Sequence, residues 1–160
     1  MNVRVLAITL HGRPWGQLFQ FGDLCRFVAL PGLGLRGDEP VLSLSMLAQR
    51  PVAAVAATGV LSLAPAAAQA ALWADVQNPL FNAQGGRLPA FFQNLLPEGV
   101  LRSHIAQLRG CREDDHFELL AACGGDLPGA VRALPIEPDR ALLQRLVTQD
   151  QDALEMSVTA

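Results

Sequence analysis

The side chains that could perform chemistry in this sequence are few, and they do not form a known catalytic frame. Nucleophilic catalysis needs a serine or cysteine close to a histidine and an orienting acid. No serine stands in the Gly-x-Ser-x-Gly turn that presents a nucleophile. Cys123 is followed by two glycines at the expected end of a helix, where the helix dipole disfavours a thiolate. We therefore predict no catalytic residue and no enzymatic activity.

Two carboxylates, Glu98 and Asp126, are the other candidates for acid–base chemistry. Glu98 follows a proline in the first turn of a predicted helix, where an acid complements the helix dipole by up to about 1 kcal/mol. Asp126 precedes a Pro-Gly turn, in which its side chain can bond its own backbone. Both acids thus have structural roles that need no substrate. The alternative of an enzyme that uses these acids would require an activity that is lost in Glu98→Gln while the fold stays intact.

One glycine-rich segment has the spacing of a dinucleotide-binding loop. Gly32, Gly34 and Gly37 follow a predicted strand in Gly-x-Gly-x-x-Gly order. Such a loop must open a helix whose N-terminus holds the pyrophosphate. Residues 38–40 are instead Asp-Glu-Pro, and the two acids would repel phosphate. We expect an ordinary loop here and no nucleotide cofactor.

Cysteines and histidines show no metal-binding pattern. The three cysteines, Cys25, Cys111 and Cys123, are scattered and include no Cys-x-x-Cys pair. His104 and His116 lie close to the last two cysteines in sequence, but the spacing matches no zinc site. We expect free thiols, as in a reducing cytoplasm, and no metal.

Length and charge indicate one domain, and the free thiols and the lack of a targeting pattern predict a cytoplasmic protein. A chain of 160 residues can bury a core without disulfides or metals. The net charge is −3, whereas a dedicated nucleic-acid binder usually has a basic face, so we predict no direct nucleic-acid binding. The start of the chain lacks a signal-peptide cleavage site. Residues 51–72 are apolar mainly through alanine and are interrupted by Gly59 and Pro65, so we predict no membrane span.

The spacing of apolar residues predicts strands, then helices, then one more strand. The predicted strands are Val3–Leu10, Gln17–Phe21, Leu24–Leu30, Val41–Leu47 and Ala130–Ile136. The predicted helices start at Leu88, at Pro97, at Asp114 or Asp115, and at Ala141, and the last runs to Val147. This order is typical of an α+β fold, here a small antiparallel β-sheet or partly closed barrel packed with three to four helices.

Two helical segments have apolar stripes. In the first, the residues at helical spacing are Phe91, Phe92, Leu95 and Leu96. In the second, which we expect to end at Gly110, they are Val100, Leu101, His104, Ile105 and Leu108. We interpret the first stripe as buried and the second as one face of an amphipathic helix.

Trp73 lies outside any strong amphipathic pattern, in a segment rich in alanine and proline that we expect to be a loop. Tryptophan is costly to leave in water and is common at binding hot spots. It can fold back onto the protein's own sheet or act as an anchor in a partner's pocket. For the second alternative, the predicted partner-binding residues are Trp73, Leu80 and Phe81.

Two longer pieces resemble a known family. FFQNLLPEGVLRSHIAQLRG, followed by DDHFELLAACGGDLPGAV, is similar to the N-terminal domain of HipA-type serine/threonine kinases. The hairpin LHGRPWGQLFQF and the element VLSLSM resemble the opening of that domain, so the resemblance covers roughly residues 3–47 and 88–136. The matching motif residues are Phe91, Phe92, Asn94, Leu95, Leu96, Pro97, Glu98, Gly99, Asp126 and Gly129.

The resemblance also has departures, which define the expected domain organisation. The family usually has proline where this chain has Leu47, and a short link where this chain has an Ala/Pro-rich insertion at about 48–87. We therefore predict a HipA N-terminal-like domain over 1–136 with this insertion. A C-terminal helix and frayed tail are expected over 137–160.

The resemblance implies a binding role. In HipA proteins this domain precedes a kinase domain that carries the catalytic residues, and we find none of those motifs in this sequence. A separate domain of this kind resembles HipS-like antitoxins, which neutralise a shortened HipA-like kinase, with a HipB-like helix-turn-helix protein possibly in the same complex. Alternatives are the N-terminal fragment of a full-length or decayed HipA-type kinase and a different interaction protein such as a transcription co-regulator.

Overall fold

The fold is built on an antiparallel hairpin near the N-terminus. The computed structural model describes residues 3–30, 42–46, 66–75, 77–140 and 144. Strands β1 (Val3–Leu10) and β2 (Arg13–Phe21) are joined by a two-residue turn, His11-Gly12, whose φ angles are 50° and 75°. Positive φ at both central residues is the geometry of a type I′ turn, which matches the twist of the flanking strands. Strand β2 thus starts four residues before the predicted Gln17.

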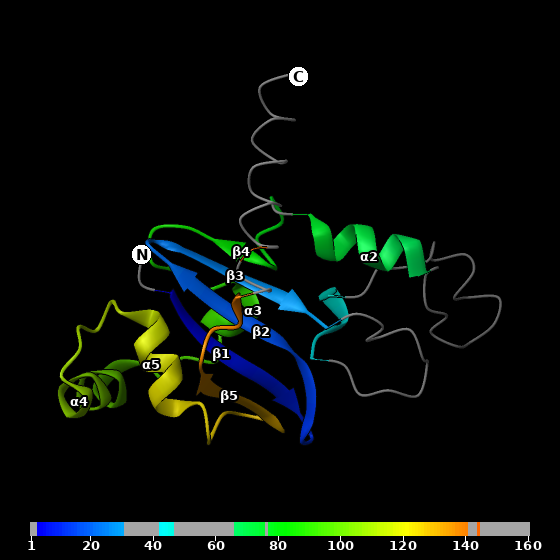
Figure 1. The fold of residues 1–160 in the computed structure, drawn as a ribbon. Coiled ribbons are helices and arrows are strands. Elements are labelled where there is room, and N and C mark those ends of the chain that lie inside the picture. Colours follow the sequence, from blue (N-terminus) through cyan, green and yellow to red (C-terminus); the bar gives the residue numbers. More distant parts are fainter. Residues whose placement is uncertain (1–2, 31–41, 47–65, 76, 141–143, 145–160) are drawn as a thin grey trace.

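Three further strands complete one open sheet. Strand β3 (Leu24–Ala29) pairs with β2, β4 (Asn82–Ala83) pairs with β3, and β5 (Val131–Ile136) pairs with β1, all antiparallel. The order is β4-β3-β2-β1-β5 (Figure 1). The strands predicted near Val3, Leu24 and Ala130 are confirmed, as is the α+β class. The partly closed barrel is wrong, because the sheet remains open with β4 and β5 at its two edges.

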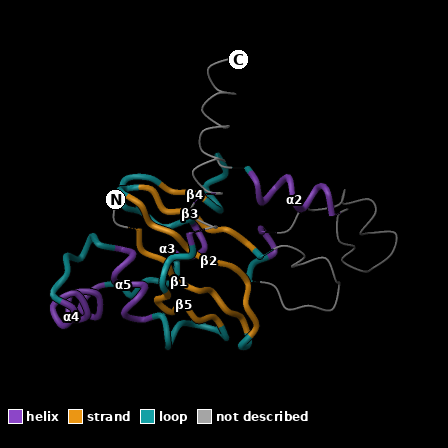
Figure 2. Tube along the Cα trace, viewed as in Figure 1, coloured by secondary structure: helices purple, strands orange, loops and turns teal. Residues whose placement is uncertain are grey.

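The main core lies between one face of the sheet and the helices. Helices α3 (Ala90–Gln93) and α5 (His116–Cys123) supply Phe92, Phe117, Leu119 and Leu120 to a cluster that contains Leu6 and Leu18 of the hairpin. Helix α4 (Gly99–Arg109) lies outside α5, and α2 (Ala66–Ala74) lies at the opposite end of the sheet, as Figure 2 also shows. A smaller cluster around Val5 and Phe19 covers the other face.

One predicted strand is wrong. In the region of Val41–Leu47, the described residues 42–46 contain a single 3-10 turn, η1 (Leu44–Met46). The hydroxyl groups of Ser43 and Ser45 are 2.7 Å apart, and the amide of Met46 donates to the carbonyl of Ser43 at 3.0 Å. Serine side chains that bond locally favour turns over strands, and this preference outweighs the alternating pattern.

The outer edge of β5 is largely closed to further strands. The amide of Ala133 points away from β1 and donates to the carbonyl of Gly124, at the end of α5, over 2.9 Å. Pro135 faces the same edge two residues later and has no amide hydrogen to donate. At the opposite edge, β4 has only two residues. Neither edge therefore offers a long row of free donors to another strand.

Three sequence predictions concern residues that the structure describes only in part or not at all. The glycine motif at residues 32–37 and most of the C-terminal segment at 137–160 lie outside the described residues. Of the predicted insertion at about 48–87, the described part includes α2 and the edge strand β4. No helix among the described residues is long and apolar enough to cross a membrane.

Candidate partner-binding site

Trp73 lies in helix α2, not in the loop that its surroundings predict. Its indole Nε1 donates to the carbonyl oxygen of Met46 at 3.1 Å. The same oxygen accepts a 2.9 Å hydrogen bond from Nε2 of Gln69, a buried side chain one turn earlier. Trp73 itself is half-buried against the main core. The helix and η1 thus hold the indole with one part packed inside and the rest facing solvent.

The other two predicted anchor residues have different surroundings. Phe81 is only 2% exposed and belongs to the main core, and its carbonyl accepts from the amide of Phe27 at 2.8 Å. The partner-anchor interpretation of Phe81 is therefore replaced by a core role. Leu80 is half-buried beside it, and its amide donates to Oδ1 of Asn78 at 3.0 Å. Partner contact by Trp73 and Leu80 stays a prediction.

The Pro97-Glu98-Gly99 segment forms the start of α4. Glu98 is the exposed N-cap residue and its side chain makes no capping hydrogen bond, so it lies just before the first turn in which the sequence placed it. Gly99 has a φ of 56°, a conformation that favours glycine. Nε of Arg102 donates to the carbonyl of Pro97 at 2.9 Å, which fixes the bend. These positions support a structural role for the motif.

The remaining motif residues are divided between core and surface. Phe92 and Leu96 are buried, while Phe91 and Leu95 are half-buried against the same cluster. Three others are exposed, and each marks the end of an element or a turn: Asn94 follows α3, Asp126 lies in the turn after α5, and Gly129 has a φ of 76° before β5.

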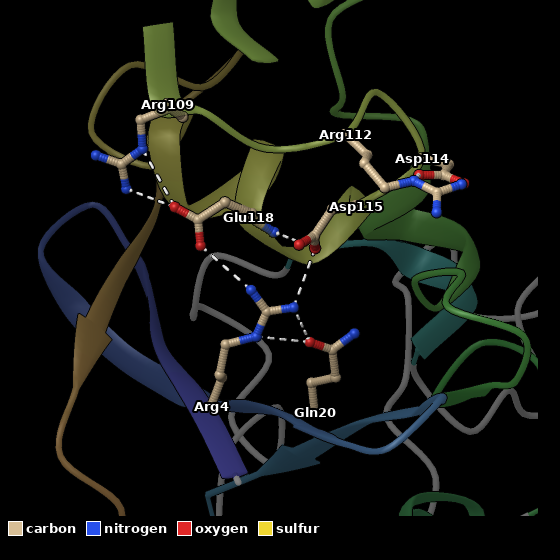
Figure 3. A network of polar contacts seen from close by, with 7 residues as sticks. All are labelled: Arg4, Gln20, Arg109, Arg112, Asp114, Asp115 and Glu118. Atoms are coloured by element: carbon tan, nitrogen blue, oxygen red, sulfur yellow. Dashed lines mark hydrogen bonds and ion pairs between the residues drawn. The ribbon is translucent and has the colours of Figure 1, made fainter. Parts of the chain in front are cut away.

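A polar network that the sequence did not reveal ties the sheet to α5 (Figure 3). The guanidinium of Arg4 contacts Asp115 at 3.0 Å and Glu118 at 3.2 Å, and it also hydrogen-bonds Oε1 of Gln20 through Nε at 2.8 Å. Its Cζ lies 4.9 Å from the ring centre of Phe117. Because Arg4 is more than a hundred residues from its acidic partners, local patterns could not pair them. The available signal is one charge inside an apolar strand.

The network extends from α5 to α4. Oε1 of Glu118 accepts two hydrogen bonds from Arg109, at 2.9 Å from Nη2 and 3.2 Å from Nε. Oδ1 of Asp115 also accepts from the amide of Glu118 at 3.1 Å, which confirms Asp115 as the N-cap of α5. Two helices and two strands are therefore held together through a few charged groups.

We expect Arg4→Ala to lower the free energy of unfolding by about 2 kcal/mol, because it leaves the partly buried Asp115 without its cation and removes one of the two cations that contact Glu118. Arg112→Ala is the matched control, since both side chains of the Arg112–Asp114 ion pair are exposed and such pairs contribute about 0–1 kcal/mol to stability. Urea denaturation at low salt measures both variants. Equal destabilisation by the two changes would contradict a structural role of the Arg4 network.

Burial shifts the pKa of several thiols and of one imidazole. Burial raises the pKa of the Cys25 thiol to about 12, and it also raises the pKa of Cys123. Burial, together with the nearby Arg102, lowers the pKa of His116, whose Nδ1 lies 3.0 Å from Oε1 of Gln93. All three cysteines are free. Among the described residues, no group of three acidic, histidine or cysteine side chains could hold a metal ion.

Comparison with known proteins identifies the module. A family model of the HipA N-terminal domain matches residues 6–134. The chain belongs to the HipA N-terminal domain family. The match begins in β1 and ends in β5, so the segment that we predicted as an insertion lies within the matched range, and its interpretation as an insertion stays a prediction. The matched family is the N-terminal part of HipA proteins and is distinct from the catalytic kinase part.

One curated relative shares part of this HipA N-terminal domain. "Putative kinase Y4dM" of Sinorhizobium fredii (strain NBRC 101917 / NGR234) is 50% identical over 54 residues, or 34% of this chain. The match covers 13% of the relative, so the chain spans a small part of that protein's length. The relative therefore places sequence of this kind in a much longer chain.

Proposed function

We propose that this protein is a non-catalytic binding module that pairs with a separate HipA-like serine/threonine kinase and neutralises or regulates it, as a HipS-like antitoxin does. The observation that carries the proposal is the family match over residues 6–134, since that family is the domain that precedes the catalytic part.

A physical argument supports association in trans. A domain that has a neighbour in the same chain carries a surface that resembles a transient protein interface. A separate copy of that domain keeps this surface and can bury it again on the kinase. Neutralisation then follows if the bound module occludes or distorts the nucleotide or substrate site of the kinase. We place this complex in the cytoplasm, with a HipB-like helix-turn-helix protein as a possible third member that contacts DNA.

Co-expression tests the proposal directly. A HipA-like kinase from the same genome that lacks its own N-terminal domain should arrest growth when it is expressed alone. Growth should recover when this protein is expressed with it, and the two should co-purify. The proposal would be refuted if this protein did not bind the kinase and if its co-expression did not relieve the growth arrest.

Trp73→Ala should weaken the complex by about 2 kcal/mol, as expected for a tryptophan at a binding hot spot. The physical reason is the part of the indole that α2 leaves exposed. Affinity is measured by calorimetry with the purified kinase. Gln84→Ala, an exposed change elsewhere in the predicted insertion, is the control. Undiminished binding and undiminished rescue by Trp73→Ala, with an unchanged melting temperature, would remove Trp73 from the interface.

One observation favours a second candidate, the N-terminal regulatory domain of a full-length or decayed HipA-type kinase. The named relative is much longer than the segment it shares with this chain. An in-frame continuation that encodes kinase motifs would favour this alternative. A neighbouring gene that encodes the kinase without this domain would favour the separate module.

A further inference from the structure

Helix α4 exposes an apolar face that the fold does not use. Val100 is 87% exposed, Leu101 57% and Leu108 72%. The large apolar side chains exposed among the described residues are Leu30, Val100, Leu101, Leu108, Leu134 and Ile136, so half of them lie on this one helix. The stripe expected from the sequence exists, but Val100, Leu101 and Leu108 point to solvent, and only Ile105 of its apolar members packs against the core.

The exposed residues form a continuous surface. At about 100° per residue, Val100, Leu101, His104 and Leu108 fall within an arc of about 100° on the helix. His104 is exposed between the apolar side chains and carries the single titratable group of this arc. Polar residues border it, with Glu98 before the helix and the Arg112–Asp114 ion pair after it. An apolar centre with a polar rim is the usual anatomy of a protein interface.

The orientation of α4 is fixed by contacts on its other side. Ala106 is buried, and Ile105 packs against the main core. Arg109 holds the helix to α5 through its two hydrogen bonds to Glu118, and Arg102 is bound to the carbonyl of Pro97. Turning the leucines inward would break these contacts and require the small Ala106 to leave the core. The helix thus presents its large apolar residues outward in a defined geometry.

The size of this face limits what can cover it. Three such side chains expose on the order of 400 Å² of apolar surface, about the largest patch on a typical monomer, which is often functional. A stable interface buries about 800 Å² on each partner. A second copy that paired through α4 alone would fall short of that area. The partner that covers this face must therefore be a protein domain that also contacts surface of this protein outside α4.

We propose that the α4 face docks on the catalytic part of the HipA-like kinase, in an apolar groove that receives Leu101 and Leu108. This inference rests on the proposed function. In the Y4dM relative, the rest of the chain is several times longer than the shared segment, so a large body lies next to sequence of this kind. Strand addition is disfavoured, because Ala133 and Pro135 leave few free donors at the outer edge of β5. A helix face inserted into a groove needs no such donors.

The test compares two variants that each replace two exposed apolar side chains. Leu101→Gln with Leu108→Gln changes the α4 face and keeps good helix formers. Leu134→Gln with Ile136→Gln is the matched control on β5. Binding to the purified kinase without its own N-terminal domain is measured by calorimetry, and folding by thermal melting. We expect at least tenfold weaker binding for the α4 variant, less than threefold for the control, and an unchanged melting temperature for the α4 variant.

The other outcomes separate the two proposals. If the wild-type protein and the α4 variant bind the kinase equally, the docking inference fails and the proposed function stands. If the wild-type protein does not bind the kinase, both fail. Self-association of the wild-type protein that is lost in the α4 variant would assign the face to a second copy and overturn the inference.

Labelling provides a second measurement. The thiol of Leu108→Cys should react quickly with a maleimide in the free protein and be protected in the kinase complex, with peptide mass spectrometry locating the label. Protection already in the free monomer would mean that the chain covers its own helix, and this would also overturn the inference.

Discussion

Replacing Gly124 by alanine is expected to lower the free energy of unfolding by about 3 kcal/mol, at the upper end of the cost of overpacking. A Cβ atom at this position would lie 1.7 Å from the carbonyl oxygen of Ala133, which is backbone and cannot turn aside. The end of α5 would have to move away from β5. That movement would also strain the hydrogen bond between the amide of Ala133 and the carbonyl of Gly124.

The neighbouring glycine is a matched control for this prediction. A Cβ atom on Gly125 would meet nothing within 4 Å, and this residue is exposed. Gly125→Ala should therefore change stability by less than about 0.5 kcal/mol. Urea denaturation of the two variants gives the comparison. Similar midpoints for both would show that α5 does not approach β5 as closely as the structure has it.

Phe92→Ala is expected to cost about 3–5 kcal/mol, the range for truncating a buried phenylalanine. The side chain is fully buried, and its ring centre lies 5.2 Å from that of Phe27 on β3 and 5.3 Å from that of Phe91. Removing it would empty the centre of the contact between α3 and the sheet. Because small domains are stable by about 5–15 kcal/mol, this one change could remove much of the net stability.

Phe91→Ala is the comparison for Phe92→Ala. The two residues are adjacent in α3, but Phe91 is only half-buried at the margin of the core. Phe91→Ala should lower the free energy of unfolding by about half as much as Phe92→Ala, since the loss scales with the apolar area that had been buried. Thermal and chemical denaturation of both variants measures which of them loses more stability. A larger loss for Phe91→Ala would contradict the placement of α3.

Much of the sheet could be predicted from the sequence, because its strands have local signals. The alternation in β1 and the His11-Gly12 turn lie within a few residues of one another. The N-cap at Asp115 is likewise local. In contrast, β4 has two residues and exists only because Cys25 and Arg26 provide a partner 56 to 58 positions away. A segment that short has no periodicity from which it could be recognised.

The candidate site was harder to predict, because exposure depends on what lies opposite a residue. Phe81 and Trp73 are both large aromatic residues in one segment, yet the first is in the core and the second is half-buried. Helical spacing identified the apolar stripe of α4 but not the direction it faces. That direction is set by the packing of Ile105 and Ala106 and by the ion pair of Arg109 with Glu118, an acid that also binds Arg4 far away in the sequence. The sequence could name the family because its motif residues fall in a few short pieces that can each be recognised locally.

The closed edge of β5 has a consequence for how genes can carry this module. When a protein is split between two pieces that each contain a sheet, an edge strand can be left with unpaired N–H and C=O groups, which promote aggregation. Here the amide of Ala133 is already used by Gly124, and Pro135 has no hydrogen to offer. At these two positions the outer edge of β5 therefore has no free amide donor for another strand. A genome could fuse the module to a longer chain or express it alone, and in neither arrangement would the sheet need a strand from outside.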